Sequence, residues 1–260
     1  MSFENKRSIL RVSREKISNI INNNHNTPSI NRTENTVSIK LEDELGRIKT
    51  SIKTNNLGKN LYPDYIGKYK DKEFIVAGCG TSIKNYNDFS KYYIIGVNDI
   101  ERILTPDFLL VVNEIRTFTR GRWEYVNKSM SPVIFSHLNP PGPIERKENL
   151  VSLKLGERYG TNLEKMDSVD FTMNSPYMGV IIAYQLGAKK IGLVGVDFTQ
   201  DHFFSKSGEH KLSKGINDID KQYGDLRIAL ERKGIKVANL SEISLLRSWP
   251  KMTLEEFDKL

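Results

Sequence analysis

The feature that most constrains the fold is an apolar run at residues 74–77 that ends abruptly in the turn Gly78-Cys79-Gly80-Thr81-Ser82. A buried strand that passes directly into small residues lets backbone N–H groups and the start of the next helix face an anion, commonly a nucleotide phosphate. Ile83 stands where the dinucleotide pattern Gly-x-Gly-x-x-Gly requires its third glycine, so the fingerprint is incomplete. Gly78, Gly80, Thr81 and Ser82 are therefore candidate phosphate-binding residues.

Further apolar runs follow, with helical patterns between them. The runs are continuous instead of alternating, which is typical of strands that helices cover on both faces. This order predicts an α/β fold of Rossmann-like type, with a doubly wound, mostly parallel sheet. The expected strands are residues 74–77, 92–97, 108–112, 133–136, 191–196 and 235–240, and the expected helices are residues 120–127, 176–186 and 215–233.

The net charge of +7 is concentrated near the N-terminus. Residues 1–72 contain 14 Lys and Arg against 8 Asp and Glu, whereas residues 73–260 contain 25 against 24. We therefore predict a basic, partly helical arm over residues 1–70 and a Rossmann-like nucleotide-binding or nucleotide-sugar-binding transferase domain over residues 71–260. The arm suits nucleic acid, an anionic membrane surface, an acidic acceptor or a homo-oligomeric contact, and a solvated leader has the same composition.

Composition also bounds the class of protein. Cys79 is the single cysteine, which excludes an intramolecular disulfide framework. No apolar run approaches the length of a membrane span, and the first residues lack the apolar core of a signal peptide. These observations predict a cytoplasmic protein.

Polar residues follow three successive apolar runs at the point where each run ends. The turn at Thr81-Ser82 follows the first run, Asn98-Asp99 the second and Asn113-Glu114 the third, and Asp197 ends a later run. The carboxyl ends of parallel strands line the ligand crevice of an open sheet, so these side chains are expected to converge. A single strand-end Asn usually caps a turn or helix, but the recurrence favours a binding pocket.

The helix expected at residues 176–186 begins with a capping signal. Ser175 has the residue type of an N-cap, and Pro176 suits the first helical position. A serine hydroxyl beside the free N–H groups at the start of a helix can form a second anion-binding site. The sequence therefore predicts an anion contact at Ser175.

These segments together resemble two related groups of transferases. One group is the bacterial sialyltransferases of glycosyltransferase family 42. The other contains archaeal 6-hydroxymethylpterin diphosphokinase and the flagellin-modifying motility-associated-factor glycosyltransferases. The resemblance covers about residues 73–247, and the segments that carry it are residues 76–82, 96–98, 112–113, 175–178 and, most specifically, 186–198.

The resemblance implies a donor pocket built from residues already singled out. It places the glycine turn and Ser82 at the nucleotide phosphates, Asn98 and Asn113 at the nucleotide or the transferred sugar, and Asn174 and Ser175 at the remaining wall. No cofactor is implied with certainty by the resemblance. The ligand of this pocket would be a nucleotide-sugar donor, which is a substrate of the reaction. The partner would be a hydroxyl acceptor.

The resemblance also suggests a histidine base. His210, just before the last long helix, is the nearest match to the base of the sialyltransferases, and His202 is a second candidate. An imidazole with a pKa of about 6.5 can take a proton from an acceptor hydroxyl near neutral pH. Phe171 stands where those enzymes have an arginine, and Phe203 and Phe204 follow where they have tyrosines, so sialic acid itself is not implied.

Three functions follow from this reading. The preferred one is an inverting glycosyltransferase that uses a nucleotide sugar. The second is a Mg²⁺-dependent pyrophosphokinase that acts on a pterin-like hydroxymethyl group, with Asp197 and Asp201 as metal ligands. The third is a non-enzymatic nucleotide-binding or nucleic-acid-binding module. The sequence has no His-x-x-x-His or Cys-x-x-Cys spacing typical of zinc sites.

Overall fold

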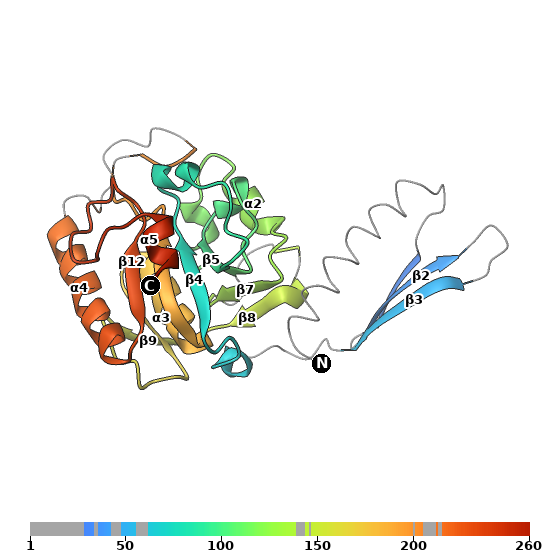
Figure 1. The fold of residues 1–260 in the computed structure, drawn as a ribbon. Coiled ribbons are helices and arrows are strands. Elements are labelled where there is room, and N and C mark those ends of the chain that lie inside the picture. Colours follow the sequence, from blue (N-terminus) through green and yellow to red (C-terminus); the bar gives the residue numbers. More distant parts are fainter. Residues whose placement is uncertain are drawn as a thin grey trace. The chain divides into compact units, whose positions relative to one another are not determined.

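The computed structural model describes residues 29–33, 36–42, 48–55, 62–138, 144–145, 147–199, 201–204, 212 and 215–260. His210 lies outside them, and so does the helical part of the predicted arm, which apolar residues spaced among charges indicate at about residues 4–22. Two compact units divide the chain, Met1–Gly58 and Lys59–Leu260 (Figure 1). In the first unit, β1 (Ser29–Thr33), β2 (Thr36–Glu42) and β3 (Ile48–Asn55) form an antiparallel sheet in that order.

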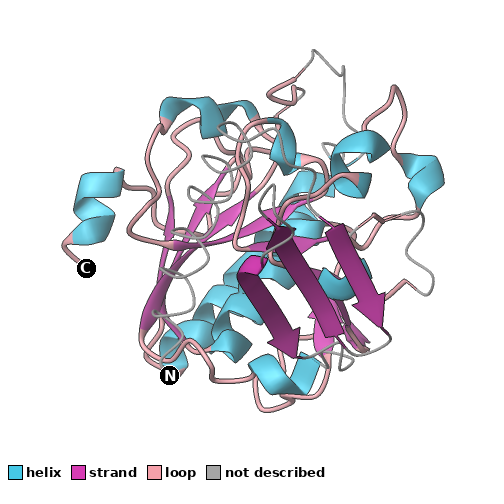
Figure 2. Ribbon diagram, turned by 90° about the vertical axis from the view of Figure 1, so that its right-hand side faces the viewer, coloured by secondary structure: helices cyan, strands magenta, loops and turns pink. Residues whose placement is uncertain are grey.

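The second unit contains a seven-stranded parallel sheet with the order β12-β11-β4-β5-β6-β7-β8. Figure 2 draws strands in magenta and helices in cyan. The chain runs outward from β4 to β8 on one side, and β11 and β12 lie on the other side of β4. The predicted Rossmann-like α/β class is confirmed. The strands are β4 (Lys72–Ala77), β5 (Tyr93–Val97), β6 (Phe108–Leu110), β7 (Val133–Ser136), β8 (Leu150–Ser152), β11 (Ala188–Val194) and β12 (Lys236–Asn239).

Two hydrophobic clusters cover the two faces of this sheet. Successive side chains of a strand point to opposite faces. Phe74 and Val76 of β4 accordingly belong to one cluster, and Ile75 and Ala77 belong to the other. Burial on both faces explains why the strands are continuous apolar runs in the sequence.

Different helices contribute to each cluster. The first cluster contains residues of α3 (Ser175–Leu186) and α4 (Ile216–Arg232). The second contains residues of α2 (Trp123–Asn127) and α5 (Leu254–Asp258). No helix among the described residues is long and apolar enough to cross a lipid bilayer.

Tyr62, Tyr65 and Tyr69 also belong to the first cluster. They lie in and just after the short 3₁₀ helix η1 (Tyr62–Tyr65), at the start of the second unit. The tyrosine rings of 62 and 65 each pack edge-on against Phe135, with 5.5 Å between ring centroids. This segment is therefore part of the domain core, although the composition grouped it with the arm.

Short elements connect the main strands. After β4, the chain forms the 3₁₀ helix η2 (Thr81–Asn85). Two short parallel strands, β9 (Leu155–Arg158) and β10 (Val169–Phe171), pair with each other beside α3. The turns η3 (Ile100–Arg102), η4 (Ile115–Thr117) and η5 (Lys147–Asn149) complete the described connections.

Candidate functional site

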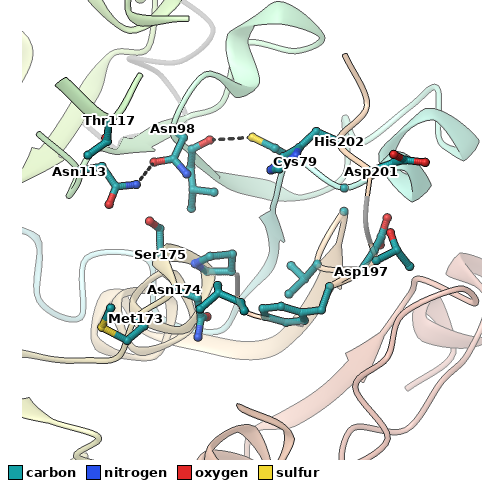
Figure 3. A pocket seen from close by; sticks show the side chains of 18 of the residues that line it. Cys79, Asn98, Asn113, Thr117, Met173, Asn174, Ser175, Asp197, Asp201 and His202 are labelled. Carbon is teal, nitrogen blue, oxygen red and sulfur yellow. Dashed lines mark hydrogen bonds between the residues drawn. The ribbon is translucent and has the colours of Figure 1, made fainter. Parts of the chain in front are cut away.

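A cavity of about 510 Å³ lies at the carboxyl edge of the parallel sheet (Figure 3). The strand order changes direction here between β4 and β11, which is the usual ligand position in open α/β sheets. Of the residues predicted from the sequence, the lining includes Gly80, Asn98, Asn113, Asn174, Ser175, Asp197 and His202. Gly78, Thr81 and Ser82 are not part of this lining.

The carboxylate of Asp197 is buried under the cavity and is fully engaged by the protein. Its Oδ1 accepts hydrogen bonds from Ser82 Oγ at 2.5 Å and Ser241 Oγ at 2.6 Å. Its Oδ2 accepts from Ser82 N at 2.9 Å and Thr81 Oγ1 at 3.5 Å. The donors that the sequence assigned to a phosphate are thus bonded to a carboxylate of the chain itself.

The glycines near this carboxylate permit a close approach of two strand ends. A Cβ on Gly80 would overlap the Asp197 carboxylate, and a Cβ on Gly78 would overlap the carbonyl of Gly195. Gly195 has a φ of +66° and lies equally close to Gly78. Packing between the ends of β4 and β11 is therefore enough to explain the Gly-x-Gly pattern.

Asn174, not Ser175, is the N-cap of α3. Asn174 has extended backbone angles, and its Oδ1 accepts hydrogen bonds from Tyr177 N at 3.2 Å and from the Tyr223 hydroxyl at 2.8 Å. Its Nδ2 donates to Thr172 Oγ1 at 2.8 Å. The expected cap at Ser175 is wrong by one residue, and Pro176 occupies the second helical position. The Asn174 side chain is committed to the helix start.

Ser175 is left as the open donor at the N-terminus of α3. Tyr177 N–H is taken by the cap, and Pro176 has no N–H. Ser175 is buried and lines the cavity, and neither its hydroxyl nor its N–H makes a hydrogen bond to another described residue. Its N–H and hydroxyl, together with the helix dipole, suit an anionic group.

Asn98 and Asn113 form a linked pair across the cavity from Ser175 (Figure 3). Asn113 Nδ2 donates to Asn98 Oδ1 at 3.0 Å. Asn98 adopts a φ of +56°, which Asn tolerates better than most residues. The pair leaves an amide N–H of Asn98 and the amide oxygen of Asn113 for a bound molecule. The prediction that strand-end residues converge is confirmed for these positions.

Arg122 is a lining residue that the sequence analysis missed. It forms a two-point contact with the buried Asp99, through Nε to Oδ2 at 3.0 Å and Nη2 to Oδ1 at 2.5 Å. Burial works to lower the pKa of Arg122, but the hydrogen bonds and charge of Asp99 outweigh it and raise the pKa. The partners are 23 positions apart in the sequence, so a local motif search does not find this pair.

Cys79 lines the same wall of the cavity. Burial raises the pKa of its thiol strongly, and the negative charge of Asp99 adds to the shift. The thiol donates to the carbonyl of Val97 at 3.5 Å. A neutral, buried thiol is a packing group, so Cys79 does not have the character of a nucleophile.

His202 is held at the cavity by backbone and ring contacts. It forms an isolated antiparallel bridge with Gly80, and Phe203 N donates to Cys79 O at 2.9 Å. The imidazole stacks on Phe204 with ring centroids 5.1 Å apart. The Phe204 ring also contacts the guanidinium of Arg122 at 4.8 Å. The imidazole therefore has a defined place beside the candidate donor site.

The predicted magnesium ligands do not fit a metal site. Both oxygens of Asp197 already accept hydrogen bonds, which leaves Asp201 as the other expected carboxylate. Among the residues that the structure describes, no three or more His, Cys, Asp or Glu side chains gather in a way that suits a metal ion. No step of the chemistry below is therefore routed through a metal.

In a comparison with solved structures, the chain is similar to bacterial sialyltransferases. CstII from Campylobacter jejuni in complex with cytidine-5'-monophosphate is 17% identical, with a TM-score of 0.45 over 71% of this chain and 86% of that chain. The monofunctional α-2,3-sialyltransferase Cst-I from the same organism is 15% identical, with a TM-score of 0.43 over 71% and 81%. No family model matches the chain, and no curated protein matches it. Likeness at this level assigns the chain to no family.

Proposed function

We propose that the protein transfers a sugar from a nucleotide-sugar donor to a hydroxyl acceptor. The observation that carries the proposal is the convergence of Asn98, Asn113 and Ser175 on one cavity at the switch point of the sheet. These groups provide amide contacts on one wall and an anion contact on the other. The sequence segments that resemble nucleotide-sugar transferases supply the same residues.

In the proposed reaction, Ser175 and the α3 dipole hold the phosphate of the donor. The amides of Asn98 and Asn113 orient the sugar or the base. The acceptor oxygen forms a new bond to the anomeric carbon while the bond from that carbon to the phosphate oxygen breaks, and the configuration inverts. Fixed donors at the phosphate stabilise the charge that develops on the leaving nucleotide.

A histidine removes the proton of the acceptor hydroxyl in this scheme. His202 is our first choice because it lines the cavity, and His210 is the alternative from the sequence resemblance. The proton passes to the imidazole, which is the common role of histidine near neutral pH.

The first test is nucleotide binding by the full chain. A ligand that binds only the native state raises the melting temperature, so CMP, UDP, GDP and ATP are compared with and without Mg²⁺. We expect a rise with one nucleotide class, and we expect Ser175→Ala to reduce it. No rise with any nucleotide would overturn the proposal.

The second test is turnover of the nucleotide sugar that matches the bound nucleotide. We expect slow release of the nucleotide in the presence of water or an acceptor, and at least about a hundredfold slower release in His202→Gln, because general base catalysis contributes roughly that factor. Nucleotide binding with no turnover of any donor would favour the non-enzymatic alternative. Formation of AMP from ATP would favour pyrophosphoryl transfer.

A further inference from the structure

A second built feature lies beside the cavity, in the loop between β9 and β10. The carboxylate of Asp170 is buried inside this loop and accepts hydrogen bonds from Glu157 N at 2.7 Å and Asn162 N at 3.1 Å. Gly156 and Gly160 lie so close to it that a Cβ on either would overlap the carboxylate. The backbone between β9 and β10 is thus wound closely around the Asp170 carboxylate.

This winding holds Tyr159 in an unfavourable backbone conformation. Its φ is +63°, in the left-handed region that a bulky residue rarely adopts. Tyr159 N donates to Phe171 O at 2.7 Å, which fixes the backbone there. Tyr159 as a residue is 47% exposed and belongs to neither hydrophobic cluster. Backbone strain that serves no packing purpose is commonly found at binding sites.

The ring of Tyr159 is part of a surface that continues to the cavity. The guanidinium of Arg158 lies over the ring at 4.8 Å from its centroid. Arg158 Nη2 also donates to Met173 Sδ at 3.2 Å. Met173 is 64% exposed and lines the cavity directly before the cap of α3. We call Arg158, Tyr159 and Met173 the rim platform.

The rim platform has a fixed position relative to the candidate donor site. Tyr177 of α3 donates its hydroxyl to the carbonyl of Gly160 in the same loop at 2.9 Å. Tyr177 is fully buried and lies in the first turn of α3, two residues after Ser175. The helix that presents Ser175 to the cavity therefore also anchors the loop that presents Tyr159.

We propose that the rim platform is the acceptor subsite and that its occupant is a carbohydrate chain. This inference rests on the proposed function, because it assigns the second substrate of that reaction. The apolar face of a pyranose ring packs on the tyrosine ring and Met173, and the guanidinium of Arg158 donates to the sugar oxygens. A nucleic acid is disfavoured as occupant, because Arg158 is the single cation among the three residues of the rim platform and binding a phosphate backbone takes several Lys or Arg side chains.

The test measures acceptor binding without any donor. The labelled full chain is applied to a printed array of neutral and acidic oligosaccharides, with oligothymidine spots on the same surface. We expect retention on a subset of oligosaccharides, and at least about a tenfold loss in Tyr159→Gly, because truncating a buried-on-binding tyrosine is among the costliest changes at an interface. Tyr159→Trp keeps an aromatic surface and is expected to retain binding.

Glycine suits a positive φ, so Tyr159→Gly removes the ring and relieves the strain together. Asp71→Gly is the matched control, because Asp71 also has a positive φ, of 61°, and lies at the amino end of β4, away from the cavity. The control is expected to bind like the parent. Equal retention by Tyr159→Gly and parent, or retention of oligothymidine alone, would overturn the inference. Loss of nucleotide binding by the parent would instead count against the proposed function.

Discussion

At the scale of single residues, Asp197 stabilises the junction on which the cavity is built. Its two carboxylate oxygens accept four hydrogen bonds from Thr81, Ser82 and Ser241. In Asp197→Asn, one oxygen becomes an NH₂ group that faces donors. We expect the free energy of unfolding to fall by about 3 kcal/mol, which is typical of a broken buried polar network. Urea denaturation measures this change.

Asp201→Asn is the control for this prediction. Asp201 lines the same cavity but is partly exposed. Its replacement removes the same charge and is expected to change stability by less than about 0.5 kcal/mol. If the two variants unfolded at the same urea concentration, the role given to Asp197 would be wrong.

His137 provides a prediction about pH. Burial lowers the pKa of this imidazole, and its Nδ1 is buried with no hydrogen-bond partner among the described residues. The unfolded chain, with a histidine pKa of about 6.5, therefore binds a proton more readily than the folded chain does. The stability that comes from the neutral form is complete above the unfolded pKa and is lost as the pH falls below it.

We expect the parent to lose more stability than His137→Gln between pH 7 and pH 5. The free energy of unfolding is measured for both chains across this range, and groups that titrate identically in the two chains cancel in the difference. A difference that stays constant with pH would show that the two states protonate His137 equally.

At the scale of elements, two neighbouring residues at the N-terminus of α3 have different roles. Asn174 stabilises the helix, and Ser175 is the proposed binding residue. Both the amide oxygen and the amide nitrogen of Asn174 are hydrogen-bonded at the helix start, whereas the Ser175 side chain makes no hydrogen bond to a described residue. Asn174→Ala removes the cap and leaves the buried Tyr223 hydroxyl without its acceptor. We expect a loss of about 2 kcal/mol in the free energy of unfolding.

Ser175→Ala is expected to show the opposite pattern. Its stability should stay within about 0.5 kcal/mol of the parent, because no protein hydrogen bond is lost. Its affinity for the nucleotide should fall by about tenfold, which is the loss expected for one hydrogen bond to a charged group. Calorimetry with the nucleotide and thermal unfolding, applied to both variants, distinguish the two roles. Equal effects on binding and stability in both variants would contradict this division.

The same elements show how much of the candidate site the sequence predicts. Strand ends in a parallel sheet converge by topology alone, so Asn98 and Asn113 could be placed at the cavity. A glycine turn, however, can bind either a phosphate or a buried carboxylate. The sequence predicts a phosphate contact for Ser82, whereas the structure shows Ser82 bonded to the carboxylate of Asp197. Arg122 was missed because its partner Asp99 is close only in space.

At the scale of the whole molecule, the fold follows from the pattern of apolar runs. The six expected strands and three expected helices are all present, with ends shifted by up to three residues. The two short strands β9 and β10 carry no such run, because no residue of β9 is fully buried and β10 has three residues, of which the middle one is the charged Asp170. Tyr159 could not be singled out either, because its positive φ belongs to a turn whose residues Glu157 and Asn162 bond to Asp170, and these contacts are not visible in the local sequence.

The start of the core differs from the boundary at residue 70 that charge indicates. Tyr62, Tyr65 and Tyr69 lie between basic residues, yet all three side chains are buried in the second unit. Tyr69 packs edge-on against Phe108 at 5.1 Å between ring centroids, and Tyr62 donates its hydroxyl to Gln185 of α3. The charged residues indicate only that part of this segment faces solvent. The three buried tyrosines show that the segment also belongs to the core of the second unit.

This difference predicts the outcome of two truncations. A chain of residues 59–260 keeps the three tyrosines and is expected to unfold in one cooperative transition, at a temperature close to that of the second unit in the full chain. A chain of residues 72–260 loses them. Burial of each aromatic side chain stabilises a fold by about 2 kcal/mol, so their combined loss approaches the 5–15 kcal/mol that keeps a typical domain folded. We expect circular dichroism to show no cooperative transition for the shorter chain. If the chain of residues 72–260 unfolded as cooperatively as the chain of residues 59–260, the domain would begin after Tyr69 and the tyrosine contacts would stabilise it little.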